Sequence, residues 1–334
     1  MRRPGTLILF LLLSFLTIFL FLIDLGVGSV SIPLNEVWNA IFGGDVSVVN
    51  RQIILDIRLN KAIVALLAGA ALSVSGLQMQ TLFKNPLAGP YVLGISSGAS
   101  LGVAVFILGI PLFGASGIDL PFGLAGAAWA GAAIILIFIG IMSQRIKDIM
   151  VILILGMMFS SGVSAIVQIL QYLSHDEALK SYVIWTMGSL GEVTGRQLIV
   201  LVPAVLIGLA LAIFTIKPLN LLLLGEDYAV TMGLNIKISR NLLFLSTTLL
   251  AGTVTAFCGP IGFIGMAMPH ITRMITSNSD HKILIPATIL TGAITLIISD
   301  IISKLLVLPI NAVTALIGIP VIVIVVLRNK AITV

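Results

Sequence analysis

The fold of this chain is limited above all by a series of apolar stretches, each close to the roughly 20 residues that an α-helix needs to cross a bilayer. They lie near residues 6–24, 60–82, 91–110, 122–143, 149–171, 197–216, 241–258, 261–275, 283–303 and 309–327. The eighth is short and broken by glycines. Because 59% of the 334 residues are hydrophobic and only 9% are charged, a water-soluble fold could not bury so much apolar surface. The sequence predicts an all-α integral membrane protein of about ten transmembrane helices, forming one domain over residues 1–334.

Positive charges predict how these helices are oriented. The first apolar run, Thr6 to Ile23, is longer than the roughly 7 to 15 residues of a cleavable signal sequence, so we expect an uncleaved first helix. An inside N-terminus places most of the 18 basic residues in the cytoplasm, as the positive-inside rule requires. These are Arg2, Arg3, Lys84, Arg145, Lys147, Lys217, Lys237, Arg240, Arg273, Lys282, Arg328 and Lys330. Both termini are therefore expected in the cytoplasm.

The cytoplasmic segment 217–240 is long enough to be an element of its own. Gly225-Glu226-Asp227 predicts a helix start, because acidic residues favour a helix N-terminus, and Gly233 predicts its end. A short amphipathic helix on the inner membrane face follows. It could dock a separate ATPase or serve as a structural interfacial helix.

A faint internal repeat relates two parts of the chain at an offset of 183 residues. Leu66-Leu67-Ala68-Gly69, Gly76 and Pro86 recur as Leu249-Leu250-Ala251-Gly252, Gly259 and Pro269. An offset of five helices gives the copies opposite orientations, which is the inverted repeat of many transporters. The halves cover roughly residues 58–172 and 241–327.

Two helix breaks lie in corresponding parts of this repeat. Proline and glycine free backbone groups that lipid cannot satisfy, so such breaks are tolerated only against protein or a water-filled path. They are either simple turns or elements that shape a translocation path. The first contains Asn85, Pro86, Gly89 and Pro90, and the second contains Gly259, Pro260, Gly262 and Gly265.

Small residues at four-residue spacing predict close helix contacts. They form two stripes, Gly94, Gly98, Gly102 and Gly123, Ala127, Gly131.

The sequence offers little chemistry inside the spans. Asp24, Asp300 and Lys304 are expected near outer ends and His270 near an inner end, so each is interpreted as interfacial, not as a proton carrier. Paired carboxylates, histidine clusters with metal-ligand spacing and nucleophile triads do not occur. The lone Cys258 excludes a disulfide framework, and the dispersed basic residues do not favour a nucleic-acid partner. We expect no cofactor or metal on this chain.

No Gly-Lys-Ser or Gly-Lys-Thr occurs to hold a nucleotide phosphate, so an energy source must lie on another subunit. A secondary carrier would need a mid-membrane acid or a sodium site. A membrane enzyme would need converging catalytic groups, for which His270, Arg273 and Asp280 are the only tempting set.

Several motifs are recognisable together and in order. They are GLQMQ at 76–80, NPLAGP at 85–90, LGISSGA at 93–99, WTMGSL at 185–190, LGEDYA at 224–229, GPIGFIG at 259–265, PHITR at 269–273 and LPI at 308–310. In sequence and spacing they resemble the permeases of FecCD-type ABC importers, which carry ferric siderophores, haem or vitamin B12. The resemblance covers nearly the whole chain.

The resemblance implies a type II ABC importer permease in a bacterial inner membrane. A second permease subunit, in a homodimer or with a sister permease, would enclose the path, two ATPase subunits would bind ATP and Mg²⁺, and a solute-binding protein would deliver cargo. Ferric siderophores are the expected cargo, with vitamin B12 or haem as alternatives. The residues that match the family's ATPase-coupling segment are Leu224, Gly225, Glu226, Asp227, Tyr228, Ala229, Gly233 and Asn235.

Three cations match positions that face acidic residues of the binding protein. Arg58 and Lys61 share a helix face, and Lys304 lies at the outer end of the ninth span. We expect them to be exposed and to speed encounter with the partner; the alternative is that Arg58 and Lys61 only mark the boundary between lipid and water. The family commonly has Arg-Leu-Pro-Arg where this chain has Arg58-Leu59-Asn60-Lys61, so a bidentate grip is lost at the lysine.

Overall fold

The computed structural model describes residues 4–28, 32–110, 123–146 and 148–330, and in these ranges it contains helices and no strand. Arg2, Arg3 and Lys147 lie outside the described residues. The principal helices are α1 (Pro4–Gly26), α4 (Leu59–Leu82), α5 (Ile95–Ala104), α7 (Gly123–Arg145), α8 (Ile149–Leu173), α10 (Gly195–Phe214), α13 (Ile236–Thr247), α14 (Thr253–Cys258), α15 (Ile264–Thr276), α16 (His281–Leu306) and α17 (Ile310–Lys330). The all-α prediction is confirmed.

Shorter helices connect these spans. They are α2 (Leu34–Phe42), α3 (Val48–Gln52), α9 (Asp176–Thr186), α11 (Ile216–Leu223), α12 (Glu226–Thr231), the 3₁₀ helix η2 (Pro90–Leu93) and the π-helical segments η1 (Ile53–Arg58), η3 (Val105–Gly109) and η4 (Thr248–Gly252). Within the described residues, seven helical runs are long and apolar enough to cross a membrane. Of the other three predicted spans, two are shorter helices, Ile95–Gly109 and Ile264–Thr276, and the third corresponds to α17.

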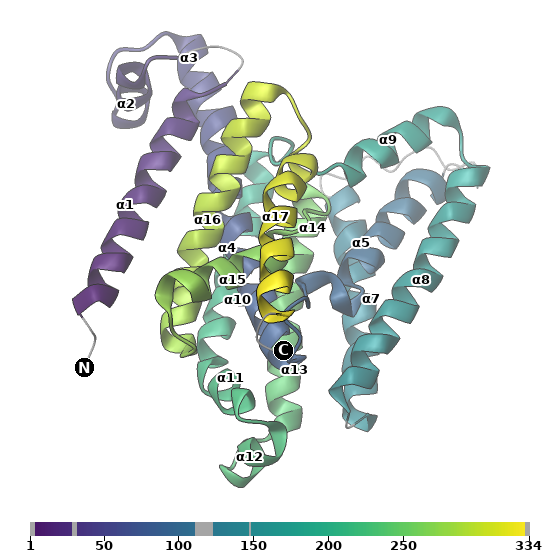
Figure 1. Cartoon of the computed structure of the whole chain (residues 1–334). Helices are drawn as coiled ribbons and strands as arrows, with labels where there is room; N and C mark the ends of the chain where they lie inside the picture. The colour runs from purple at the N-terminus through teal and green to yellow at the C-terminus, as the bar shows by residue number, and fades with distance from the viewer. Residues whose placement is uncertain (1–3, 29–31, 111–122, 147, 331–334) are drawn as a thin grey trace.

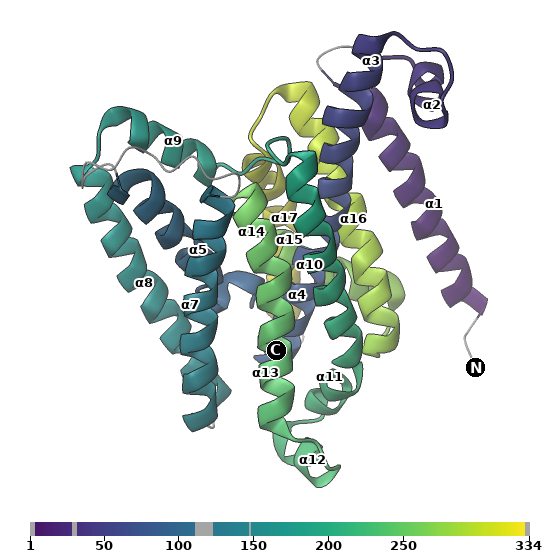
Figure 2. The ribbon, with the colours of Figure 1, turned by 180° about the vertical axis from the view of Figure 1, so that it is seen from behind.

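Helix α4 forms the centre of the bundle and packs against α16, α15 and α10 (Figures 1 and 2). Small residues allow this packing: a Cβ at Gly69 would overlap the Gly292 carbonyl, and one at Gly76 would overlap the Gly265 carbonyl. Ser73 strengthens the α4–α16 contact, because its hydroxyl lies 3.0 Å from the Thr288 carbonyl oxygen.

Helices α5 and α7 form a second close pair. A Cβ at Gly102 would overlap the Ala127 carbonyl, and one at Gly98 would lie 2.6 Å from the Gly131 carbonyl oxygen. The close approach predicted from the two stripes of small residues is therefore confirmed at these positions.

The register of the predicted repeat is wrong. Gly76 lies inside α4 whereas Gly259 ends α14, and Pro86 lies in a turn whereas Pro269 lies inside α15. Short Leu-Ala-Gly matches are common in apolar helices, and here they gave the wrong offset between the two parts of the repeat. A long buried run, a break, a shorter helix and two longer helices nevertheless follow one another in both parts of the chain.

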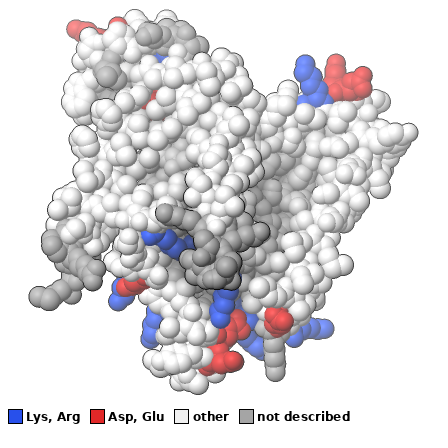
Figure 3. Space-filling model, in the orientation of Figure 1, with Lys and Arg blue, Asp and Glu red and all other residues white. Residues whose placement is uncertain are grey.

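The two ends of the bundle differ. α12 projects at one end, here called the α12 end, while α2, α3 and α9 lie at the opposite end, here called the α9 end (Figures 1 and 2). Charged side chains on the visible face gather at these ends, and the band between them carries few (Figure 3). α1 lies at the periphery, and only 6% of its most apolar 18-residue stretch is buried.

Candidate functional site

The predicted coupling segment forms two short helices at the α12 end. Gly225 has a φ of +114° directly before α12, and Gly233 has a φ of +83° two residues after its end. These left-handed conformations favour glycine. The helix start and stop predicted from Gly225-Glu226-Asp227 and Gly233 are confirmed.

An ion pair fastens α12 to α13. Arg240 donates from one Nη to both carboxylate oxygens of Glu226, at 2.7 and 2.8 Å, and its other Nη lies 3.3 Å from the Ile146 carbonyl oxygen. The Arg240 side chain is only 4% exposed. Glu226 therefore holds α12 in place, which the sequence did not indicate.

The other predicted coupling residues divide into supporting and exposed positions. Ala229 is buried, and the Asn235 side chain accepts from the Ile238 N–H to cap α13. Leu224 and Tyr228 are exposed, as is Asp227. Val230 and Met232, which the sequence patterns did not single out, extend this apolar surface.

The two helix breaks meet in space. The Tyr91 hydroxyl, directly after the first break, donates to the Ile261 carbonyl oxygen at 3.0 Å in the second. A Cβ at Gly265 would overlap the Pro90 ring. Gly259 has a φ of +74°, and the Gly262 N–H donates to Asn311 at 2.9 Å. Asn85 accepts from the Leu87 N–H and closes the first turn.

Both breaks line a hollow of about 380 Å³. Its wall includes Gly89 and Pro90 from the first break and Gly265 from the second, beside Ser97 of α5 and Ser160 of α8. Pro86 lies elsewhere: its carbonyl oxygen is 2.7 Å from the His270 ring.

A second hollow of about 270 Å³ adjoins the first, since both include Ser97. Pro260 lines it, together with polar side chains of α8. Ser161, Ser164 and Gln168 are exposed on one face of this helix. Their spacing of three and four residues is a signal present in the sequence, although the motifs considered above do not include it.

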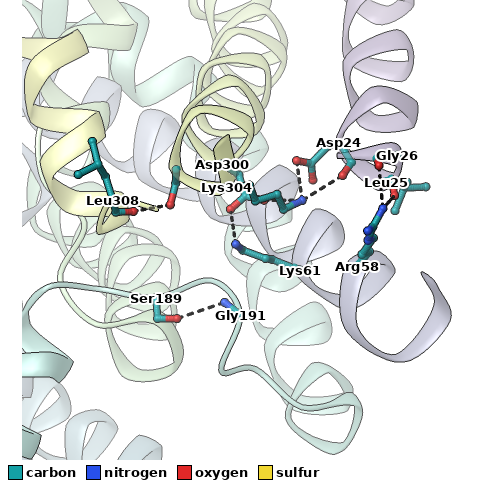
Figure 4. Close-up of polar contacts among 11 residues, drawn as sticks. Asp24, Leu25, Gly26, Arg58, Lys61, Ser189, Gly191, Asp300, Lys304 and Leu308 are labelled. Atoms are coloured by element: carbon teal, nitrogen blue, oxygen red, sulfur yellow. Dashed lines mark hydrogen bonds and ion pairs between the residues drawn. The ribbon is translucent and has the colours of Figure 1, made fainter. Parts of the chain in front are cut away.

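The three cations expected to face a binding protein lie in an internal network at the α9 end (Figure 4). Lys304 contacts the Asp24 and Asp300 carboxylates at 2.7 and 2.9 Å, and Lys61 contacts Asp300 at 3.0 Å. Arg58 donates to the carbonyl oxygens of residues 25 and 26 at 2.9 and 2.7 Å.

The expected exposure of these cations is therefore wrong for two of the three. Arg58 is 5% exposed and the Lys304 side chain 8%, because the end of α1 covers them, while Lys61 is half-buried. Their role in docking stays a prediction.

The tempting enzyme cluster does not converge. Arg273 donates to Gln80 at 2.7 Å, His270 contacts the first helix break, and Asp280 accepts from Asn220 at 2.7 Å. Among the described residues, no three His, Cys, Asp or Glu side chains are placed to hold a metal ion.

Residues 16–328 match the model of the FecCD transport family. The chain belongs to this family. A FecCD relative, the hemin transport system permease protein HmuU of Yersinia pestis, is 34% identical over 327 residues, covering 96% of each chain. The vitamin B12 import system permease protein BtuC of Klebsiella pneumoniae is 36% identical over 323 residues, covering 95% of this chain and 93% of that protein.

A solved structure of a metal-chelate type ABC transporter in an inward-facing conformation has the same fold. It superposes with a TM-score of 0.83 and 30% identity over 96% of this chain and 98% of that one. The FecCD chain described here is thus a multi-pass ABC importer permease of the type II fold, and in its family ATP hydrolysis belongs to a separate subunit.

Proposed function

We propose that this permease imports a metal chelate, most specifically a ferric siderophore, across a bacterial inner membrane. It does so with a second permease subunit, two ATPase subunits and a solute-binding protein. The observation that carries the proposal is the exposed apolar surface of residues 224–235, here called the α12 segment.

That surface lies at the α12 end of the bundle, where charged side chains also gather (Figure 3). Leu224, Tyr228, Val230 and Met232 are each at least half exposed there. Apolar groups gathered in this way are typical of a protein interface. A cytoplasmic ATPase is the partner that supplies what the sequence lacks, because it brings the nucleotide-binding site.

The polar face of α8 supports a second permease subunit. Gln168 exposes an amide on a membrane-spanning helix, and an unsatisfied amide in lipid is costly. The cost disappears when this face lines a watery path shared with another subunit. The adjoining hollows at the two helix breaks lie on the same path.

This arrangement places the α12 end in the cytoplasm and the α9 end outside. The basic residues Lys217, Lys237 and Lys282 then lie on the cytoplasmic side, in agreement with the positive-inside rule. α1 begins toward the α12 end and α17 runs toward it (Figure 1), which supports the prediction that both termini are cytoplasmic.

The relatives and the uncharged lining of the two hollows support a metal chelate as the cargo. The named relatives import haem and vitamin B12, and the solved neighbour is of the metal-chelate type. Serine and glutamine side chains suit a bulky, oxygen-rich chelate, because they offer hydrogen bonds without trapping it by charge.

The test is competition in uptake. Proteoliposomes containing the permease, its ATPase and its binding protein receive radiolabelled ferric siderophore, with haem or cobalamin as competitor. Accumulation of the siderophore complex that neither competitor reduces supports the proposal. Accumulation of cobalamin or haem instead assigns that cargo and refutes the siderophore.

A further inference from the structure

Asn220 lies in the middle of α11, the helix that leads into the α12 segment, and is bonded to the start of α16. Its Oδ1 accepts from the His281 backbone N–H at 2.9 Å and lies 2.7 Å from the ring Nδ1, and its Nδ2 donates to Asp280 at 2.7 Å. The Asp280 carboxylate is ionised at neutral pH, because the hydrogen bond from the Lys282 backbone N–H holds its pKa below the ordinary value, and an ionised carboxylate only accepts.

The His281 ring continues this connection into the centre of the bundle. Since Asn220 Oδ1 already accepts from one N–H, the ring Nδ1 is a donor to it. The other ring nitrogen, Nε2, lies 3.0 Å from the Thr81 hydroxyl on α4. His281 is 1% exposed and Thr81 4% exposed, so water competes little for these bonds.

Three elements are thus joined by a continuous chain of side chains. Asn220 belongs to α11, His281 to α16 and Thr81 to α4. Helices α16 and α4 are closely packed against each other. Gln80, the residue before Thr81 on α4, donates to the Met266 carbonyl oxygen at 2.9 Å and accepts from Arg273; both partners lie on α15. Through α4 the connection therefore extends to α15, the helix that follows the second break.

Capping alone does not explain Asn220. Asp280 already caps α16, because its carboxylate accepts from the Lys282 N–H at 2.9 Å. Asn220 instead comes from another element, 61 residues away in sequence, and satisfies both the backbone and the ring of His281.

We propose that Asn220, His281 and Thr81 form a relay that transmits movement of the α12 segment, through α11, to α4 and α16. Asn220 is its positioning residue. The inference rests on the proposed function. It adds a specific route by which the movement driven by ATP hydrolysis is transmitted to α4 and α16.

The experiment measures cargo transported per ATP hydrolysed in proteoliposomes containing the full importer. Asn220→Ala should lower this ratio by ~5-fold or more, the lower end of typical coupling between sites, while ATP hydrolysis continues. Thr81→Val should also lower it, and this nearly isosteric change guards against a failure of Asn220→Ala to fold. The double variant should be no worse than Asn220→Ala, because both changes break one relay.

Asn278→Ala is the matched control. It removes an amide from the loop between α15 and α16, where Asn278 bonds only to the Asp280 backbone N–H among the contacts described, and the ratio should stay at the wild-type value. Wild-type ratios in both Asn220→Ala and Thr81→Val would overturn the relay, as would losses that multiply in the double variant. A wild-type importer that accumulates cargo without ATP would instead refute the proposed function, so the two failures are distinguishable.

Discussion

Replacing Lys304 by methionine tests whether the network at the α9 end is internal support or a docking surface. Methionine keeps an unbranched stem but removes the charge shared by Asp24 and Asp300, which are 0% and 1% exposed. Lys61, on the half-buried side of the network, can compensate only Asp300. Breaking a buried ion pair by removing one partner costs about 3–5 kcal/mol. At about 1.4 kcal/mol per factor of ten, the folding equilibrium falls by roughly two to three and a half powers of ten.

The assay is thermal unfolding of the detergent-solubilised permease, followed by tryptophan fluorescence. Lys304→Met should lower Tm by several degrees, and adding Asp24→Asn should restore part of the loss, because the buried carboxylate without a partner is then gone. Lys180→Met, at an exposed position of α9, is the control and should melt like the wild type. A wild-type Tm in Lys304→Met, together with weaker binding-protein association at low salt, would refute the internal role and restore the docking interpretation.

Three further changes test the packing, the α12 segment and the path. Gly102→Leu should cost at least about 1–3 kcal/mol of stability, because the added side chain separates α5 from α7; an unchanged denaturation midpoint contradicts this. Glu226→Gln weakens the contact with Arg240, so uptake should fall more than ATP hydrolysis does. An equal fall in uptake and in ATP hydrolysis would show that the Glu226–Arg240 pair does not couple them. Ser164→Leu with Gln168→Leu should slow uptake while leaving Tm unchanged or higher; normal uptake would mean that this face of α8 contacts lipid.

The positions of the spans along the sequence were predictable, because crossing a bilayer imposes a length and a composition that any membrane helix must meet. The glycines at 225 and 233 were equally informative, since a backbone in the left-handed region favours that residue. Local rules of this kind need no knowledge of the tertiary structure.

Contacts between distant residues were not predictable from one sequence. Lys304 and Asp24 are 280 residues apart, and nothing near either residue indicates that the end of α1 covers the lysine. The same holds for Gln78, a buried residue of α4 whose amide bonds to Thr215 at 3.2 Å and to Ser246 at 3.0 Å. Charge near a helix end was interpreted as exposed, whereas packing decides exposure.

The polar face of α8 is a different case, because its signal was present. Ser161, Ser164 and Gln168 repeat at helical spacing within a predicted span. A search for polar residues on one face of each span would have found them. Only the structure, however, shows that this face adjoins the hollows at the helix breaks.

Import driven by ATP on a separate subunit is best tested through the energy source for uptake. Proteoliposomes with the permease, its ATPase and its cargo-loaded binding protein receive either ATP, a non-hydrolysable analogue, or a proton or sodium gradient alone. We expect accumulation with ATP only, and none when the ATPase is omitted. Accumulation driven by an ion gradient without ATP would contradict ATP-driven import.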